Sequence, residues 1–265
     1  MTTTVRPEAD RPLAHAALIP PLDERAGSYR LRFARTENDL EECRRVRFRV
    51  FNLELGEGFD TAYETGLDED EFDLQCQHLM VEHIGLGETI GTYRMQVSEV
   101  AMAGMGFYAA SEFDLSMLPA DLMDDSIELG RACIAKEHRD HKVLFLLWRG
   151  LAAYATHTGR RRMFGCSSLT SQDEAEGLRF FEQLRREGHV HPTLHLDPLD
   201  AYACKAETFE GPEVQTPKLF KTYLRHGAKI LGPPAIDRAF GTIDYLTLLE
   251  VTEEQLQFFG GTRRS

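Results

Sequence analysis

The chain has 265 residues, of which 42% are hydrophobic, and a formal net charge of −13 at pH 7. This acidic balance argues against general nucleic-acid binding, which needs a basic surface to neutralise phosphates. No apolar run approaches the roughly 20 residues of a membrane-spanning helix, and the N-terminus lacks the basic start and apolar core of a secretory signal, so we expect a cytoplasmic protein. The five cysteines form no CxxC pair and the ten histidines show no metal-site spacing. We therefore expect reduced thiols and no metal.

Residues 1–28 combine several prolines with polar residues, which predicts a flexible leader without a core contribution. One folded domain is expected over 29–251, followed by a C-terminal tail over 252–265. The domain begins with a strand from Tyr29. Thr36 and Asp39 then have the spacing of an approximate capping box. The helix that follows has a predicted buried stripe of Leu40, Cys43, Val46 and Val50.

The remaining pattern alternates between strands and helices. Two strands joined through Gly85 and Gly87 are expected between Gln77 and Val97, and the segment after them is irregular with short helices. Gly159 is expected to end the helix that follows the central strand. The later elements are a central strand over 126–134, strands over 163–168, 228–231 and 243–251, and helices over 174–187 and 219–226, with Leu178, Phe181 and Leu184 pointing inward from the first of these helices. This order predicts a mixed α/β fold with a central sheet flanked by helices.

The central strand carries Glu128 and Arg131 among Ile, Leu and Cys residues. Burying an unpaired charge costs several kcal/mol, so charged residues in such a strand usually have a partner or a ligand. This strand is therefore the best candidate for a functional site. A basic turn and an apolar helix follow it, beginning at Arg139.

Several short motifs follow one another in order: Arg47-Phe-Arg-Val-Phe51, Glu54-Leu-Gly56, Asp70-Glu-Phe-Asp73, His78-Leu-Met-Val81, Gly91-Thr-Tyr-Arg94, Glu128-Leu-Gly-Arg131 and Gly232-Pro-Pro-Ala-Ile-Asp-Arg238. With the order of elements over 29–251, they resemble the GNAT acyltransferase superfamily, and within it the ornithine-lipid N-acyltransferases. That resemblance implies a GNAT-type α/β fold. It also implies transfer of a 3-hydroxyacyl chain from acyl carrier protein to the α-amine of ornithine, which would give a lyso-ornithine lipid.

The motifs also resemble the acyl-homoserine-lactone synthases, which are the alternative. Against them, the tryptophan expected soon after the first helix is absent, since Glu57 follows Gly56 and the only tryptophan is Trp148. A third hypothesis is a non-catalytic acyl-binding or membrane-associated protein. Other acceptors, such as glutamine, glycine or lysine, and a peripheral contact with the inner membrane are left open.

The expected donor follows from the run 139–144, which contains no glycine with which to wrap a pyrophosphate. Arg139 and Lys142 would suffice for the single phosphate of a phosphopantetheine arm. We therefore expect acyl carrier protein as partner and co-substrate, and no permanently bound cofactor. Because this carrier is acidic, a basic patch that includes Arg161 and Arg162 is expected to dock it.

Amide formation from a thioester needs a base for the ammonium proton and fixed donors for the oxyanion. Glu128 is the candidate base, and an ion pair with Arg131 or Arg94 is the competing interpretation. Backbone N–H groups of Ala132, Cys133 and Ile134, where the strand bulges or splays, are the expected oxyanion donors. For the Cys133 side chain, core packing is favoured over a nucleophilic role.

The resemblance also implies acceptor-binding residues. Asp70 and Asp73 either recognise a cationic acceptor such as ornithine or form a solvated loop. Arg47 and Arg94 would hold the acceptor carboxylate or order that loop, and Phe51 completes the first motif. For the acyl chain, the predicted lining is Met102, Met105, Phe107 and Phe113, against a plain core role for the same residues.

Overall fold

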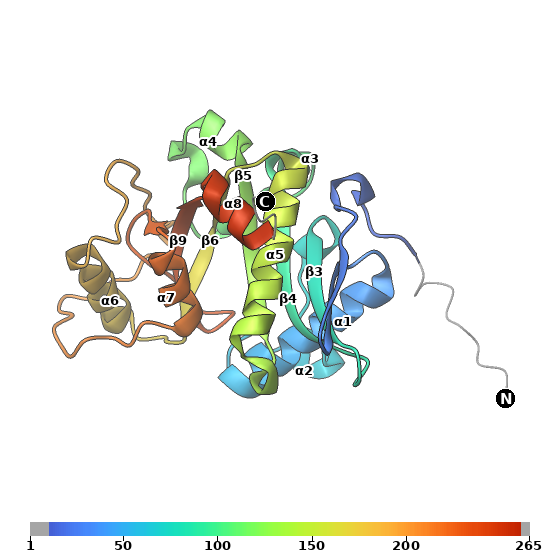
Figure 1. Ribbon diagram of the computed structural model, residues 1–265. Coiled ribbons are helices and arrows are strands. Elements are labelled where there is room, and N and C mark those ends of the chain that lie inside the picture. Colours follow the sequence, from blue (N-terminus) through green and yellow to red (C-terminus); the bar gives the residue numbers. More distant parts are fainter. Residues whose placement is uncertain (1–10, 261–265) are drawn as a thin grey trace.

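The computed structural model describes residues 11–260, which form one nine-stranded mixed sheet with helices on both faces (Figure 1). The sheet order is β1-β2-β3-β4-β5-β6-β9-β7, and β8 pairs with β9. The strands are β1 Asp23–Ala26, β2 Tyr29–Phe33, β3 Gln77–His83, β4 Glu88–Val97, β5 Ser126–Ile134, β6 Arg162–Leu169, β7 Lys229–Ile230, β8 Ala235–Asp237 and β9 Thr242–Glu250. The helices are α1 Glu37–Phe48, α2 Ala62–Thr65, α3 Ser98–Ala103, α4 Ala120–Asp124, α5 His141–Thr158, α6 Glu174–Arg186, α7 Lys218–Arg225 and α8 Glu253–Gly260. The predicted mixed α/β class is confirmed.

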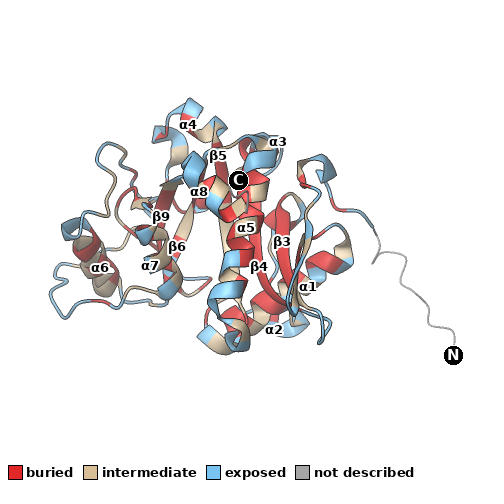
Figure 2. Cartoon of the chain, in the orientation of Figure 1, coloured by how far each residue is buried: buried red, intermediate tan, exposed pale blue. Residues whose placement is uncertain are grey.

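Helices α1 and α5 cover opposite faces of the sheet. Successive side chains of a strand alternate between faces, so Leu79 and Met80 of β3 point in opposite directions. Met80 packs in one buried cluster with Leu40 and Cys43 of α1. Leu79 meets α5 at Gly150, where a Cβ would clash with the leucine side chain. The core lies between these layers, and the central strands and the inner side of α5 are buried (Figure 2).

The predicted start of α1 is confirmed. The side chain of Thr36 accepts a hydrogen bond from the backbone of Asp39, and the carboxylate of Asp39 accepts one from the backbone of Thr36. This pair satisfies two N–H groups that the first helical turn leaves free. The predicted buried stripe is also confirmed, because Leu40, Cys43, Val46 and Val50 are all buried.

The sheet opens between β5 and β6. These parallel strands pair only over Ser126–Glu128, against Arg162–Phe164, and they diverge after Glu128 while β6 stays paired with β9. At the point of divergence, any Cβ on Gly165 would clash with the backbone oxygen of Leu129. The second half of β5 therefore has no strand partner on this side.

The predicted bulge in β5 is present. Thr92 pairs with Cys133 and Arg94 with Gly130, so β5 has one more residue than β4 in this interval. Arg131 lies there with φ 50°, a left-handed conformation that non-glycine residues seldom adopt. Such a residue persists only when its surroundings hold it, and it is common at functional sites.

The ends of the domain differ from the prediction. The leader was expected to add nothing to the core, but Leu13 and Ile19 are buried and β1 pairs with β2, so the prediction is wrong for 11–28. Residues 1–10 lie outside the described residues. The predicted tail also forms a helix, α8, which packs on α5, whereas 261–265 are not described. In α6 the fully buried aromatic residue is Phe180, and Phe181 is only partly buried.

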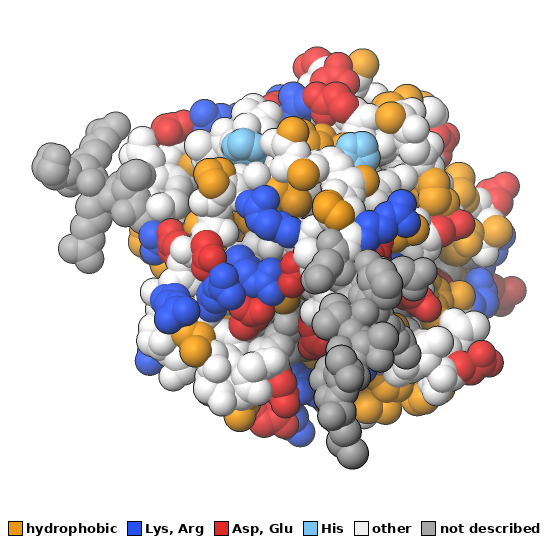
Figure 3. Space-filling view, turned by 90° about the vertical axis from the view of Figure 1, so that its right-hand side faces the viewer, with side chains coloured by type: hydrophobic (Ala, Val, Ile, Leu, Met, Phe, Trp, Pro, Cys, Tyr) orange, Lys and Arg blue, Asp and Glu red, His pale blue; other side chains and the backbone are white. Residues whose placement is uncertain are grey.

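Strand β1 forms one edge of the sheet, and ionic side chains of both signs lie on the face beside it (Figure 3). Arg30 pairs with Asp23 across β1 and β2, and Arg32 pairs with Asp39 at the start of α1. Charged residues at an edge strand disfavour pairing with another chain. Across residues 11–260, no helix has both the length and the apolar content to cross a membrane.

Candidate active site

A cleft of about 780 Å³ occupies the opening between β5 and β6. Its walls come from both faces of the sheet: Leu129 and Met163 line it on the α5 side, and Glu128 and Cys166 line it on the other side. The cleft therefore passes through the sheet. On the α5 side its wall is largely apolar, from Tyr93, Leu144, Leu147, Trp148, Leu151, Tyr223, Leu249, Val251, Leu256 and Phe259. On the other side polar groups gather, from Glu57, Ser168, Thr170 and Asp244, whereas Ser167 and Thr247 point to the α5 side.

Glu128 lies at the last residue pair before the strands diverge, and only 6% of it is exposed. Its carboxylate accepts hydrogen bonds from the side chain of Gln96 (2.7 Å) and from the backbone N–H groups of Tyr108 (3.0 Å) and Ala109 (2.8 Å). Burial raises the pKa of Glu128, and these hydrogen bonds only partly offset the rise. The competing interpretation, a direct ion pair with Arg131 or Arg94, is not among its contacts within residues 11–260.

Arg131 faces the cleft beside Glu128. Its guanidinium stacks on the ring of Phe240, with 4.4 Å to the centroid, and on that of Tyr108, with 5.0 Å. It also pairs with Asp70 at 3.0 Å and with Asp68 at 3.4 Å. These contacts hold the left-handed backbone at this position and aim a cation at the cleft wall.

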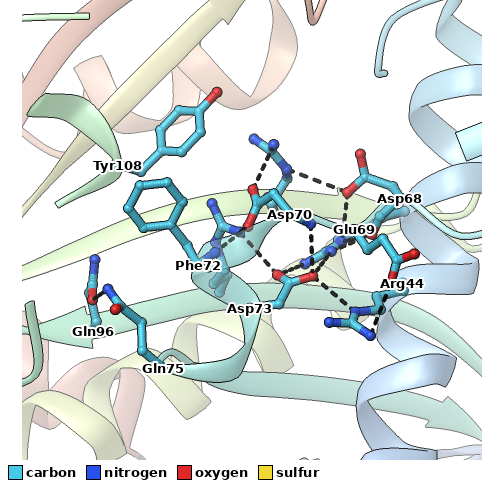
Figure 4. A network of polar contacts seen from close by, with 12 residues as sticks. Arg44, Asp68, Glu69, Asp70, Phe72, Asp73, Gln75, Gln96 and Tyr108 are labelled. Atoms are coloured by element: carbon cyan, nitrogen blue, oxygen red, sulfur yellow. Dashed lines mark hydrogen bonds and ion pairs between the residues drawn. The ribbon is translucent and has the colours of Figure 1, made fainter. Parts of the chain in front are cut away.

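Asp70 and Asp73 belong to a buried ionic network (Figure 4), and neither of these two residues lines the cleft. Asp73 binds Arg47 (2.6 Å) and Arg94 (3.0 Å), and Asp70 binds Arg94 (2.5 Å). Burial alone would raise the pKa of Asp73, but the charges of Arg47 and then Arg94 outweigh it and hold the pKa well below its usual range. The carboxylates of Asp70 and Asp73 are thus shielded from solvent and already paired with arginines, although Glu69 and Glu71 of the same segment are exposed. Of the predicted roles for Arg47 and Arg94, the contacts favour ordering this segment, although Arg94 also lines the cleft.

The other residues that were predicted for the site on the central strand and near the first helix line the cleft. Ala132, Cys133 and Ile134 line the cleft on the part of β5 that pairs with β4 but has no partner on the β6 side. Cys133 is buried in the main core cluster, and burial raises the pKa of its thiol, which favours the packing role. Phe51 also lines the cleft, and its ring lies edge-on to that of Phe240.

The predicted basic residues lie at opposite ends of α5. Arg139 precedes the N-terminus and lines the cleft, and Lys142 is exposed in the first turn. Arg161 and Arg162 follow the C-terminus, about 27 Å away for an 18-residue helix. They pair with Glu253 and Asp125 and do not line the cleft.

Helix α7 supplies basic groups that the sequence analysis did not single out. Lys218, Lys221 and Arg225 are exposed, lie on one side of the helix and line the cleft. None of the three forms an ion pair within the described part of the chain. Their spacing of three and four residues, which places them on one face of a helix, could have identified this basic face from the sequence.

The predicted acyl lining is wrong. Met102 and Met105 are exposed, at 79% and 48%, and Phe107 and Phe113 are buried in a second core cluster. None of the four lines the cleft. The irregular segment instead supplies Tyr108 to the cleft wall and the N–H groups that hold Glu128.

Sequence reasoning missed a second polar group in the cleft. Asp244 of β9 and Cys166 of β6 lie beside Glu112, and their possible ligand atoms are all within 4.8 Å of one another. Asp244 is a charged residue in the interior of β9, next to Ile243 and Tyr245, and a charge in such a position is the signal that singled out Glu128. That signal was available in the sequence.

Residues 46–149 match the family described as "Acetyltransferase (GNAT) domain". With the mixed sheet, the diverging strands and the cleft between them, this match defines the class as a GNAT-type acyltransferase.

The relatives narrow the assignment. The chain is 32% identical over 259 residues to "L-ornithine N(alpha)-acyltransferase" of Brucella abortus, a match that covers 89% of this chain and 90% of that protein. It is 32% identical over 255 residues to the protein of the same name from Agrobacterium fabrum, covering 89% and 87%. The chain therefore belongs to the L-ornithine Nα-acyltransferase family. Among solved structures, the AHL synthase LasI matches with a TM-score of 0.49 and 12% identity, covering 89% of this chain and 97% of that chain.

Proposed function

We propose that this protein transfers a fatty acyl group, such as a 3-hydroxyacyl group, from acyl carrier protein to the α-amine of L-ornithine, giving a lyso-ornithine lipid. The cleft through the sheet is the main structural support. An apolar arm against α5 suits an acyl chain, and a polar arm on the other side suits an amino acid. The two substrates would meet where β5 and β6 diverge, beside Glu128.

The unpaired part of β5 would receive the phosphopantetheine arm. Its free backbone groups would pair with the amides of the arm as an added strand would. The carrier itself would dock at the cleft rim, where α7 presents Lys218, Lys221 and Arg225 and where Arg139 lies just before α5, with Lys142 exposed in the first turn of that helix. A basic rim on an acidic enzyme favours an acidic partner at this place.

In the proposed reaction the α-amine attacks the thioester carbonyl, a C–N bond forms, and the C–S bond breaks to release the carrier thiol. Glu128 accepts the proton from the amine, directly or through a water, because its raised pKa suits a general base. Backbone N–H groups of Ala132 to Ile134 would stabilise the oxyanion.

The first test is to incubate the purified protein with 3-hydroxyacyl carrier protein and a panel of amino acids, and to read the products by mass. We expect acyl-ornithine and free carrier thiol in equal amounts. Consumption of S-adenosylmethionine with lactone formation would instead identify a signal synthase. No product with any amino acid would refute the proposal.

The second test is Glu128→Gln. We expect kcat to fall by about 100-fold or more, within the usual range for loss of a general base. Because Glu128 accepts bonds from two backbone N–H groups, a glutamine amide leaves one of them facing another donor, and a stability loss of about 1–3 kcal/mol is also expected. The assay is therefore run at a temperature where circular dichroism shows both proteins folded. A normal kcat would rule out the base.

A further inference from the structure

Two carboxyl groups from distant parts of the chain meet at the polar arm of the cleft. Glu112 comes from the segment that covers the sheet, and Asp244 comes from β9. They are almost fully buried, with 1% and 3% exposed, and the sulfur of Cys166 lies next to them, 3.8 Å from Glu112 Oε2. Asp244 and Cys166 line the cleft, so a ligand in the cleft can reach this group.

Each carboxyl group has few hydrogen-bond partners. Glu112 Oε1 and Asp244 Oδ1 are buried without a donor within residues 11–260. The other oxygen of Glu112 accepts a bond from the thiol of Cys166, and the other oxygen of Asp244 accepts one from the hydroxyl of Thr242 (3.2 Å). Ser168 also bonds Asp244, and the two carboxyls are close enough to share a hydrogen bond when one of them is protonated. Arg131 is a nearby cation that acts on Glu112, but its guanidinium is bound by two other aspartates. Burial, and then repulsion from neighbouring carboxyls, raises the pKa of both groups. Buried carboxylate oxygens without donors favour the binding of a ligand that carries a positive charge and hydrogen-bond donors.

A primary ammonium fits this site. It carries one positive charge and three N–H donors, and the free oxygens of Glu112 and Asp244 offer two acceptors. A tightly held metal ion would also need the thiolate of Cys166, yet burial raises the pKa of this thiol well above its usual value. The chemistry of the donors therefore favours an ammonium over a metal.

The position relative to Glu128 fits a diamino acid. Glu128 pairs with Phe164 and Asp244 pairs with Ser168, so the two carboxyls lie four residues apart along β6, on the same side of the sheet. This corresponds to about 13 Å along the strand before the side chains reach toward each other. The two amines of extended ornithine are roughly 6 Å apart by standard bond lengths. The difference between these two lengths leaves room for the side chains of Glu128 and Asp244 to reach the ligand, or for a water beside Glu128.

We propose that Asp244 and Glu112 bind the side-chain ammonium of the acceptor and so select a cationic amino acid over a neutral one of the same shape. This inference rests on the proposed acyl transfer. The α-amine is then left to react near Glu128. This assigns acceptor selection to β9 and to the covering segment, away from the network of Asp70 and Asp73.

The experiment compares L-ornithine with L-norvaline, which has the same carbon chain and lacks the side-chain amine. Wild type, Asp244→Asn, Glu112→Gln and the exposed control Glu213→Gln are assayed with 3-hydroxyacyl carrier protein. We expect wild type to prefer ornithine by about 100-fold or more in kcat/KM, as sites built to bind a polar group do. Asp244→Asn should lower kcat/KM for ornithine by at least about tenfold and leave norvaline within about twofold. The KM for the carrier substrate and the behaviour of the control should not change.

Calorimetric titration of each amino acid into the same proteins gives a readout that does not need turnover. A tenfold weaker affinity of Asp244→Asn for ornithine, with no change for norvaline, supports the ammonium site even if the wild type transfers no acyl group, in which case only the proposed function fails. Unchanged discrimination in both variants overturns the inference. So does a stoichiometric metal in purified wild type that is absent from Asp244→Asn.

Discussion

The substitution Asp244→Asn should make the folded protein more stable at neutral pH. Asp244 is buried without full hydrogen bonding, and its pKa rises from 3.8 to about 6. The folded state thus keeps a proton that the unfolded chain has already released, so the contribution of Asp244 to stability falls as the pH rises from about 4 through about 6. Moving the pKa from 3.8 to about 6 corresponds to about 3 kcal/mol. Asparagine has the same shape and no titration.

This magnitude is an upper value, because the new amide must find acceptors. Its oxygen can accept from Thr242, and its N–H₂ group can donate to the free oxygen of Glu112. We therefore expect a gain of about 1–3 kcal/mol at pH 7. Urea unfolding of both proteins at pH 4, 5, 6 and 7 measures it, with the exposed Asp197→Asn as a control that should stay within about 0.5 kcal/mol of wild type.

The pH dependence is the decisive part of this prediction. The stability difference between Asp244→Asn and wild type should be close to zero at pH 4 and reach its full value by about pH 6. Equal m-values would show that the unfolded states are comparable. A variant that is less stable at pH 7, or a difference that does not change with pH, would refute the reasoning.

Two further predictions separate the other charged sites. Asp73→Asn leaves two buried arginines without full compensation and should lower the unfolding free energy by about 3–5 kcal/mol at pH 7. Glu69→Gln, which removes a partly exposed pair with Arg44, should lower it by under about 1 kcal/mol. Similar losses for both variants in urea unfolding would contradict a stabilising role for the buried ionic network. Lys221→Glu at the cleft rim should raise the KM for acyl carrier protein about threefold or more, and less at high salt, while Arg161→Glu at the far end of α5 should have little effect. Equal effects would argue against docking at this rim.

Local patterns in the sequence were enough to predict the elements that position the site. The capping box at Thr36, the apolar stripe of α1 and the glycine that ends α5 each depend on residues within a few positions of one another. The same holds for β5, in which Glu128 stood out as a charge in an apolar strand. Interactions at this range are set by backbone geometry and side-chain period, which the sequence displays directly.

Contacts between distant segments could not be predicted in this way. The sequence predicted the acidic motif at Asp70 as a surface loop or an acceptor site, because its partners Arg94 and Arg131 lie 24 and 61 residues away. Residues 1–28 were predicted to be flexible from their composition, and 252–265 were predicted only as a tail, yet β1 and α8 are stabilised by packing on β2 and α5. Tertiary burial decided each of these cases.

Two groups of buried carboxyls in this protein differ in how their charge is balanced, and the difference bears on where the acceptor binds. Arginines surround Asp70 and Asp73, and the pKa of each is lowered despite burial. Glu112 and Asp244 are buried without such partners, and the pKa of each is raised. A neutralised network contributes to folding without any ligand, whereas an unneutralised pair that opens on a cleft costs stability until a cation binds. The amino acid with a second amine is the substrate that would supply this cation, so the destabilised pair, and not the acidic motif, is the place where acceptor selectivity should be altered first.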